Sequence, residues 1–169
     1  MDIALIIERL VPSASYQGST TDNTEDSYST LVWADERTKP TWQQITDEAA
    51  IYTKEDLFTH LAAYRYSKEV GGVVIGGLPV PTDDRTKTLL VGAYNDAIYE
   101  ANPTRERKFK IGSGFITLTN ADLMGIALTI AAHVQKCFDC ESTIFSQILD
   151  NSITTKSGIE TAFDAAYAQ

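Results

Sequence analysis

The stretch that decides the fold is Gly71–Leu90, which reads GGVVIGGLPVPTDDRTKTLL. A β-branched run, Val73–Ile75, lies between two glycine pairs, and a second apolar run follows the pair Gly76–Gly77. Because glycine adopts positive φ angles at little steric cost, a glycine pair between two apolar runs predicts a tight turn. We therefore expect a small hairpin of Val73–Ile75 against Leu78–Val80, and the alternative is an ordinary loop between two helices.

A helix is expected directly after this hairpin. Thr82 or Asp83 can cap a helix that begins near Asp84, because either side-chain oxygen can accept from the first free backbone N–H groups. Apolar residues then recur at helical spacing until Asn102-Pro103 closes the segment.

A helix is also expected before the hairpin. Thr41-Trp42-Gln43-Gln44 fits the capping-box pattern, and the following residues keep a helical period to about Val70. A second start signal at Thr53 leaves open whether one bent helix or two helices cover this range. The spacing places Leu57, Leu61 and Tyr64 inward and Arg65, Lys68 and Glu69 outward.

The second half of the chain predicts another hairpin and the longest helix. Arg107–Leu118 alternates apolar and polar residues on both sides of Gly112-Ser113-Gly114, which indicates a β-hairpin. Thr119 should cap a helix that ends near Asp150, and Gly158–Tyr167 should form a final short helix. The apolar stripe expected along the longest helix, as the spine of the core, comprises Leu123, Ile126, Ala127, Ile130, Val134, Cys137, Phe138, Ile144 and Ile148.

The first forty residues have a different composition. Asp2–Val11 and Leu31–Trp33 are apolar runs that predict two short strands, and the polar segment Pro12–Thr30 between them predicts a long loop. We therefore expect an extended N-terminal strand or arm segment over residues 1–40 and a helical domain over residues 41–169. The alternative is a mobile N-terminal tail. The expected fold class is α+β, with a mainly helical body and two short β-hairpins.

Composition excludes several classes of partner. The chain has 169 residues and a formal net charge of -9, which disfavours contact with the phosphate backbone of nucleic acids. No apolar stretch approaches the roughly 20 residues that a membrane span needs. Asp2 stands where a secretory signal carries basic residues, so we expect the protein to be made and kept in a cytoplasm until it is assembled into something else.

Two cysteines, Cys137 and Cys140, form a C-x-x-C pair within the expected long helix. A redox site would place such a pair at the start of a helix, and a zinc site would need two further ligands, of which His133 could supply one. The favoured interpretation is two reduced thiols on or near the core-facing stripe. No other catalytic motif occurs, so we expect no enzymatic activity, no catalytic or metal-binding residues and no cofactor.

The central residues carry a resemblance to a known family. Val70–Tyr94 resembles a bacteriophage domain family of unknown biochemical function whose members occur in tail-fibre and tail-fibre-associated proteins. The resemblance continues through Lys108–Ile148, where Phe115–Thr119 and Ala131–Phe138 are similar to the family patterns F-x-x-L-T and A-x-H-V-x-x-C-F. The first strand of the second hairpin often carries a Trp in that family, and a Phe stands in that region here.

The resemblance implies a structural role in the virion tail. We expect the protein to dock on a tail fibre, baseplate or tail-tip protein, in three or six copies, without binding nucleic acid or membrane. The alternative is a tail-fibre assembly chaperone that is absent from the mature virion. The apolar N-terminal segment could add a strand to a partner's sheet. The expected partner-binding residues are Ile3, Leu5, Ile7, Leu31, Trp33 and Trp42.

Overall fold

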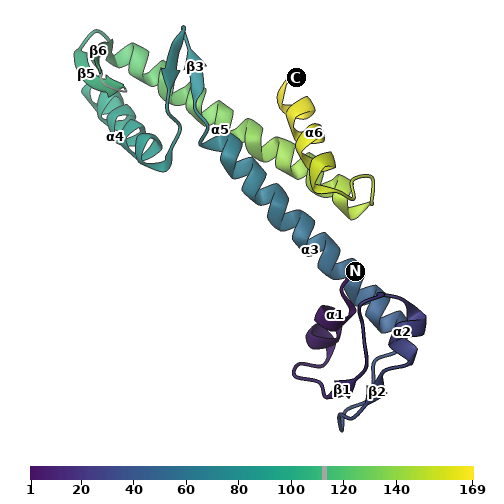
Figure 1. The fold of residues 1–169 in the computed structure, drawn as a ribbon. Helices are drawn as coiled ribbons and strands as arrows, with labels where there is room; N and C mark the ends of the chain where they lie inside the picture. The colour runs from purple at the N-terminus through teal and green to yellow at the C-terminus, as the bar shows by residue number, and fades with distance from the viewer. Residues whose placement is uncertain (112–113) are drawn as a thin grey trace. The chain divides into compact units, whose positions relative to one another are not determined.

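The computed structural model describes residues 1–111 and 114–169, which are drawn in colour in Figure 1. Its helices and small antiparallel sheets make an α+β fold, as the sequence predicts. Contacts divide the chain into two compact units, Met1–Leu57 and Phe58–Gln169. The division falls within a single continuous helix, α3 (Trp42–Glu69), whereas the change in composition placed it after residue 40.

The N-terminal unit surrounds a small apolar core. Thr41 and Gln44 form the expected capping box at the start of α3, with a distance of 3.2 Å from the Gln44 N–H to Thr41 Oγ1. The buried side chains of this core are Ile3, Ile6, Ile7, Tyr28, Leu31 and Ile45. Its other elements are α1 (Ile3–Leu10), β1 (Tyr16–Gln17), α2 (Glu25–Ser29) and β2 (Val32–Trp33).

The strand predicted over residues 2–11 is wrong, because this segment forms helix α1. Asp2 caps it by accepting a hydrogen bond from the Leu5 N–H at 3.1 Å. An apolar run this short fits both the two-residue period of a strand and the 3.6-residue period of a helix. Only the helical period turns Ile3, Ile6 and Ile7 toward one core.

The prediction of an extended N-terminal arm is also wrong. The polar segment after α1 contains β1 and the short helix α2, which is capped reciprocally by Thr24 and Ser27. Strand β2 lies within the predicted apolar run, and it pairs antiparallel with β1 through Tyr16↔Trp33 and Gln17↔Val32.

The hairpin predicted from the glycine pairs is confirmed in the C-terminal unit. Strands β3 (Val73–Ile75) and β4 (Leu78–Val80) pair antiparallel. The turn residues Gly76 and Gly77 have φ angles of 59° and 81°, which an L-residue with a side chain rarely adopts. The glycines therefore determine where this hairpin turns.

Helix α4 (Asp84–Glu100) follows, as predicted, with Asp83 as its N-cap. Strands β5 (Glu106–Ile111) and β6 (Gly114–Thr119) then form the second antiparallel pair. Of the turn predicted at Gly112-Ser113-Gly114, the first two residues lie outside the described residues.

Helix α5 (Asn120–Leu149) is the spine of the C-terminal unit, and its predicted capping by Thr119 is confirmed. Helix α4 packs on the first half of α5, and α6 (Lys156–Tyr167) packs on its second half (Figure 1). The residues that α5 buries repeat every three or four positions, and they are Asn120, Leu123, Ile126, Ile130, His133, Cys137, Cys140, Ile144 and Ile148. Among residues 1–111 and 114–169, no helix combines the length and the apolar character that crossing a bilayer requires.

Candidate functional site

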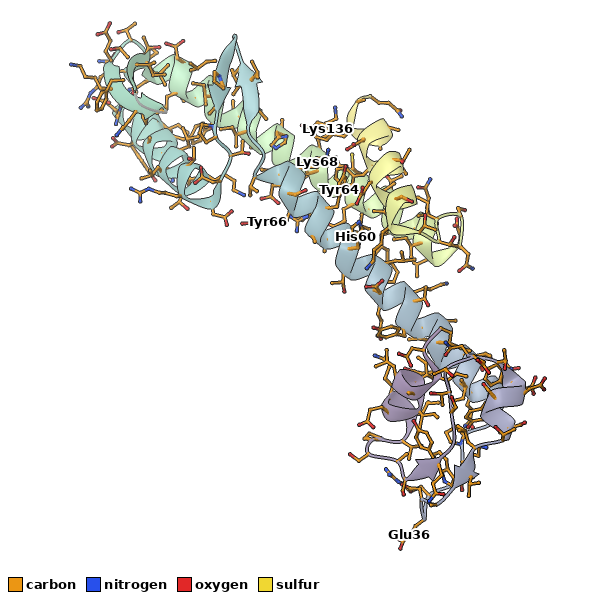
Figure 2. The ribbon with its side chains drawn as sticks, viewed as in Figure 1. Glu36, His60, Tyr64, Tyr66, Lys68 and Lys136 are labelled. Atoms are coloured by element: carbon orange, nitrogen blue, oxygen red, sulfur yellow. The ribbon has the colours of Figure 1, made fainter. Side chains whose placement is uncertain are left out.

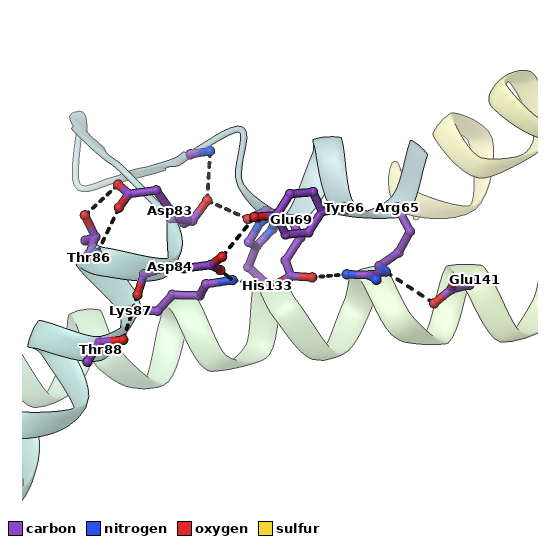
Figure 3. A network of polar contacts seen from close by, with 12 residues as sticks. Arg65, Tyr66, Glu69, Asp83, Asp84, Thr86, Lys87, Thr88, His133 and Glu141 are labelled. Atoms are coloured by element: carbon purple, nitrogen blue, oxygen red, sulfur yellow. Dashed lines mark hydrogen bonds and ion pairs between the residues drawn. The ribbon is translucent and has the colours of Figure 1, made fainter. Parts of the chain in front are cut away.

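A polar centre lies where α3 ends against α5 (Figure 3). The backbone carbonyl oxygen of Glu69 accepts two hydrogen bonds, from Thr82 Oγ1 at 2.6 Å and from His133 Nε2 at 3.1 Å. A helix leaves its last carbonyl groups without partners inside the helix, so these two side chains complete the C-terminus of α3. Thr82 Oγ1 also accepts from the Gly72 N–H at 2.9 Å, which ties the start of the first hairpin to its end.

The Glu69 side chain is 8% exposed, so the prediction that it faces solvent is wrong. Its carboxylate accepts from Arg65 on α3 and from Lys87 on α4. Arg65 continues the network to Glu141 on α5, at 3.3 Å from Nε to Oε2. Helical spacing cannot reveal this burial, because the lysine comes from a helix eighteen residues further along the chain.

His133 connects this centre to the last helix. A carbonyl oxygen can only accept, so Nε2 carries a proton and donates to Glu69. The other ring nitrogen, Nδ1, lies 2.6 Å from the Tyr167 hydroxyl on α6. Both ring nitrogens of His133 are therefore engaged in joining α3, α5 and α6.

The two cysteines are free and buried, which confirms that they lie on the core-facing stripe. Burial raises the pKa of the Cys137 thiol to about 11 and also raises that of Cys140. Both thiols are therefore protonated near neutral pH, and the nucleophilic species is the thiolate. Within the described part of the chain, no three His, Cys, Asp or Glu residues converge in a way that could hold a metal ion.

Helix α6 is fixed to α3 by a second set of polar contacts. Figure 2 labels His60, Tyr64 and Lys68 along α3. Asp164 on α6 accepts from Tyr64 at 3.0 Å and pairs with Lys68 at 2.7 Å. His60 Nε2 lies 3.0 Å from the Glu160 carboxylate, so His60 is a packing residue on the surface of α3.

The expected partner-binding residues fall mainly into the N-terminal core. Ile3, Ile7 and Leu31 are at most 4% exposed, so they stabilise their own unit and are not displayed to a partner. Trp33 and Trp42 pack against the same core, and Trp33 Nε1 donates to the carbonyl oxygen of Arg37 at 2.7 Å. Leu5 is the most exposed residue of the six, with 36% of its surface accessible.

An apolar groove lies between α4 and α5, and we call it the α4–α5 groove. It encloses about 310 Å³. The two helices run antiparallel there, because Lys87 and Phe138 border one end while Glu100 reaches Asn120 beyond the other. The groove is lined by Lys87, Leu90, Val91, Ala127, Ile130, Ala131, Val134, Gln135 and Phe138.

The sequence prediction assigned four of the groove residues to the core-facing stripe, and they are Ala127, Ile130, Val134 and Phe138. Phe138 is 44% exposed, and Val91 across the groove is 60% exposed. The sequence does contain a signal for this surface, because Ala127, Ala131, Val134 and Phe138 form a second apolar row beside the buried one. A helix with two apolar rows can cover one with its own unit and leave the other for another polypeptide.

Fold and surface together define a small α+β protein with a helical body and an exposed apolar groove. Residues 52–167 match the model of a family described as a domain of unknown function (DUF4376), and the chain belongs to this family. The matched range covers almost all of the C-terminal unit, including the groove and the polar centre. No curated protein and no solved structure matches the chain.

Proposed function

We propose that this protein is a non-enzymatic component of a phage tail that docks on a tail fibre, baseplate or tail-tip protein through the α4–α5 groove. The groove is the observation that carries the docking role. Its floor includes Ala127 and Ala131, whose short side chains allow another backbone to approach closely. A channel between two antiparallel helices suits the apolar face of a third helix.

The assignment to phage tails rests on the resemblance of Val70–Tyr94 and Lys108–Ile148 to a family found in tail-fibre proteins. These stretches form most of the C-terminal unit, including the first hairpin, the second hairpin and helix α5. They also supply every residue that lines the groove.

The absence of catalysis is part of the proposal. The side chains of the polar centre are engaged with one another and with the backbone, and they join helices α3, α4, α5 and α6 and the connection between β4 and α4. The buried thiols of Cys137 and Cys140 are poor nucleophiles. An enzyme built on these cysteines would need them exposed to a substrate.

Mass spectrometry of purified phage particles from the source cells tests the role. The proposal expects peptides of this chain in stoichiometric proportion to the other tail proteins. Particles that lack the chain would contradict the proposal. If the particles lack the chain and the fibre fails to trimerise in cells without it, the role of assembly chaperone would replace the structural role.

A further inference from the structure

The β5–β6 hairpin has one face toward the core and one toward solvent. Directly opposed residues of an antiparallel pair lie on the same face. Phe109 on β5 and Leu118 on β6 lie on one face, and both pack against the core of the C-terminal unit. The opposite face carries Lys110 across from Phe115, and Lys108 lies across from Thr117.

The outward face displays a large apolar ring beside two lysines, and Glu106 at the start of β5 is the one carboxylate among the described residues of that face. Phe115 is 73% exposed, and Lys108 and Lys110 are exposed. The nearby arginines are compensated, since Arg107 on β5 pairs with Asp96 at 2.6 Å and Arg105, just before β5, pairs with Glu100. Neither lysine has a carboxylate within ion-pair distance among residues 1–111 and 114–169.

The opposite charge is concentrated in the N-terminal unit. Residues 1–57 contain eleven Asp and Glu against four Lys and Arg, whereas residues 58–169 contain twelve against ten. Asp22, Glu25 and Asp26 are exposed within five residues of one another. In the described part of the chain these three carboxylates have no ion-pair partner either.

We propose that the hairpin face formed by Lys108, Lys110 and Phe115 binds the acidic segment Asp22–Asp26 of a second copy of this chain. The two surfaces differ, so the contact is head-to-tail, and each bound copy leaves one surface free for the next. Such a contact closes into a ring or continues as a filament, depending on the rotation between copies. This inference rests on the charges of the chain and does not depend on the phage assignment.

The net charge of -9 does not prevent this contact. At about 0.15 M salt the screening length is about 8 Å, so distant charges of two copies hardly repel each other. Charges that meet directly across an interface are screened less, and they set its specificity and its salt dependence.

A charge-swap experiment on the full chain tests the proposal. The variant K108E/K110E reverses the hairpin face, and D22K/E25K reverses the acidic segment. Each variant alone opposes like charges and should weaken self-association at least about tenfold in sedimentation equilibrium. Mixing the two variants should restore association, because every contact then joins opposite charges again.

The wild-type chain supplies the remaining outcomes. Its weight-average mass should rise with protein concentration at about 0.15 M salt and fall again at about 0.5 M salt. A wild-type chain that stays monomeric throughout would overturn the proposal, as would variants that associate like the wild type. Circular dichroism of each variant separates loss of the contact from loss of folding. The docking role on a tail protein would survive either failure, since it uses the α4–α5 groove.

Discussion

The His133 imidazole on α5 donates a hydrogen bond from Nε2 to the carbonyl oxygen of Glu69, the last residue of α3, over 3.1 Å. The two residues are 64 positions apart in the sequence. This bond closes the end of one long helix onto the middle of another, and Tyr167 on α6 meets the same ring. The C-terminal unit is therefore held by a polar junction as well as by its apolar stripe.

Replacing His133 tests this junction. His133→Ala leaves the buried Glu69 carbonyl oxygen with one hydrogen bond fewer and opens a gap between α3 and α5. We expect the free energy of unfolding to fall by about 1–3 kcal/mol in urea titrations. His60→Ala is the matched control, because the His60 ring is 26% exposed and should contribute less. Equal losses in the two variants would contradict the role given to His133.

The first hairpin makes a second prediction. Gly76 and Gly77 both have positive φ angles, so Gly76→Ala or Gly77→Ala should destabilise the protein by about 1 kcal/mol. Gly92 lies inside helix α4 with no heavy atom within 4 Å of an added Cβ, so Gly92→Ala should stabilise by up to about 1 kcal/mol. Thermal unfolding should thus shift in opposite directions, and a shift in the same direction would show that the turn is not constrained.

The cysteines make a third prediction. The pKa of Cys137 is raised to about 11, above the value of about 8.5 for an exposed thiol. Near pH 8 the folded protein should therefore react with a thiol reagent at least about 100-fold more slowly than the urea-unfolded chain. The same shift means that stability is greatest below the unfolded pKa and declines as pH rises toward the folded value. Rapid modification of both thiols in the folded protein would contradict their burial.

The helix caps make a prediction at acid pH. Hydrogen bonds from Thr86 lower the pKa of Asp83, and hydrogen bonds from Thr119 lower that of Asp122. A carboxylate with a lowered folded pKa stabilises the fold above its unfolded pKa of about 4, and this contribution is lost as pH falls through the folded value. The variant D83N/D122N keeps side chains that can cap but cannot titrate. Its stability should fall less steeply than the wild type between about pH 5 and pH 3, and identical slopes would exclude the caps as a cause.

The sequence predicted the C-terminal unit well because its signals are local. Glycine pairs, Asp83 and Thr119 act on residues within four positions, so the hairpins and caps follow from short patterns. The burial of Glu69 did not follow, because it depends on Lys87 and His133 from other helices. The groove was missed for the same reason, since one helix does not show which of its two apolar rows a neighbour will cover.

The N-terminal unit shows the limit of short patterns. Residues 3–10 fit a strand or a helix, and the choice depends on Tyr28, Leu31 and Ile45, which complete the core from later in the chain. Most of the apolar residues that the sequence offered to a partner are instead buried in that core or packed against it. We therefore place the proposed partner surface in the α4–α5 groove and not in the N-terminal segment.

The central claim is that the α4–α5 groove docks this protein on a tail protein. The most direct measurement is the amount of chain recovered in purified particles for two neighbouring variants of α5. Ala131→Glu places a charge in the groove, whereas Ala132→Glu places the same charge on an exposed position outside it. We predict that Ala131→Glu is lost from the particles while Ala132→Glu is retained, with both variants folded by circular dichroism. Equal incorporation of the two variants would contradict the claim.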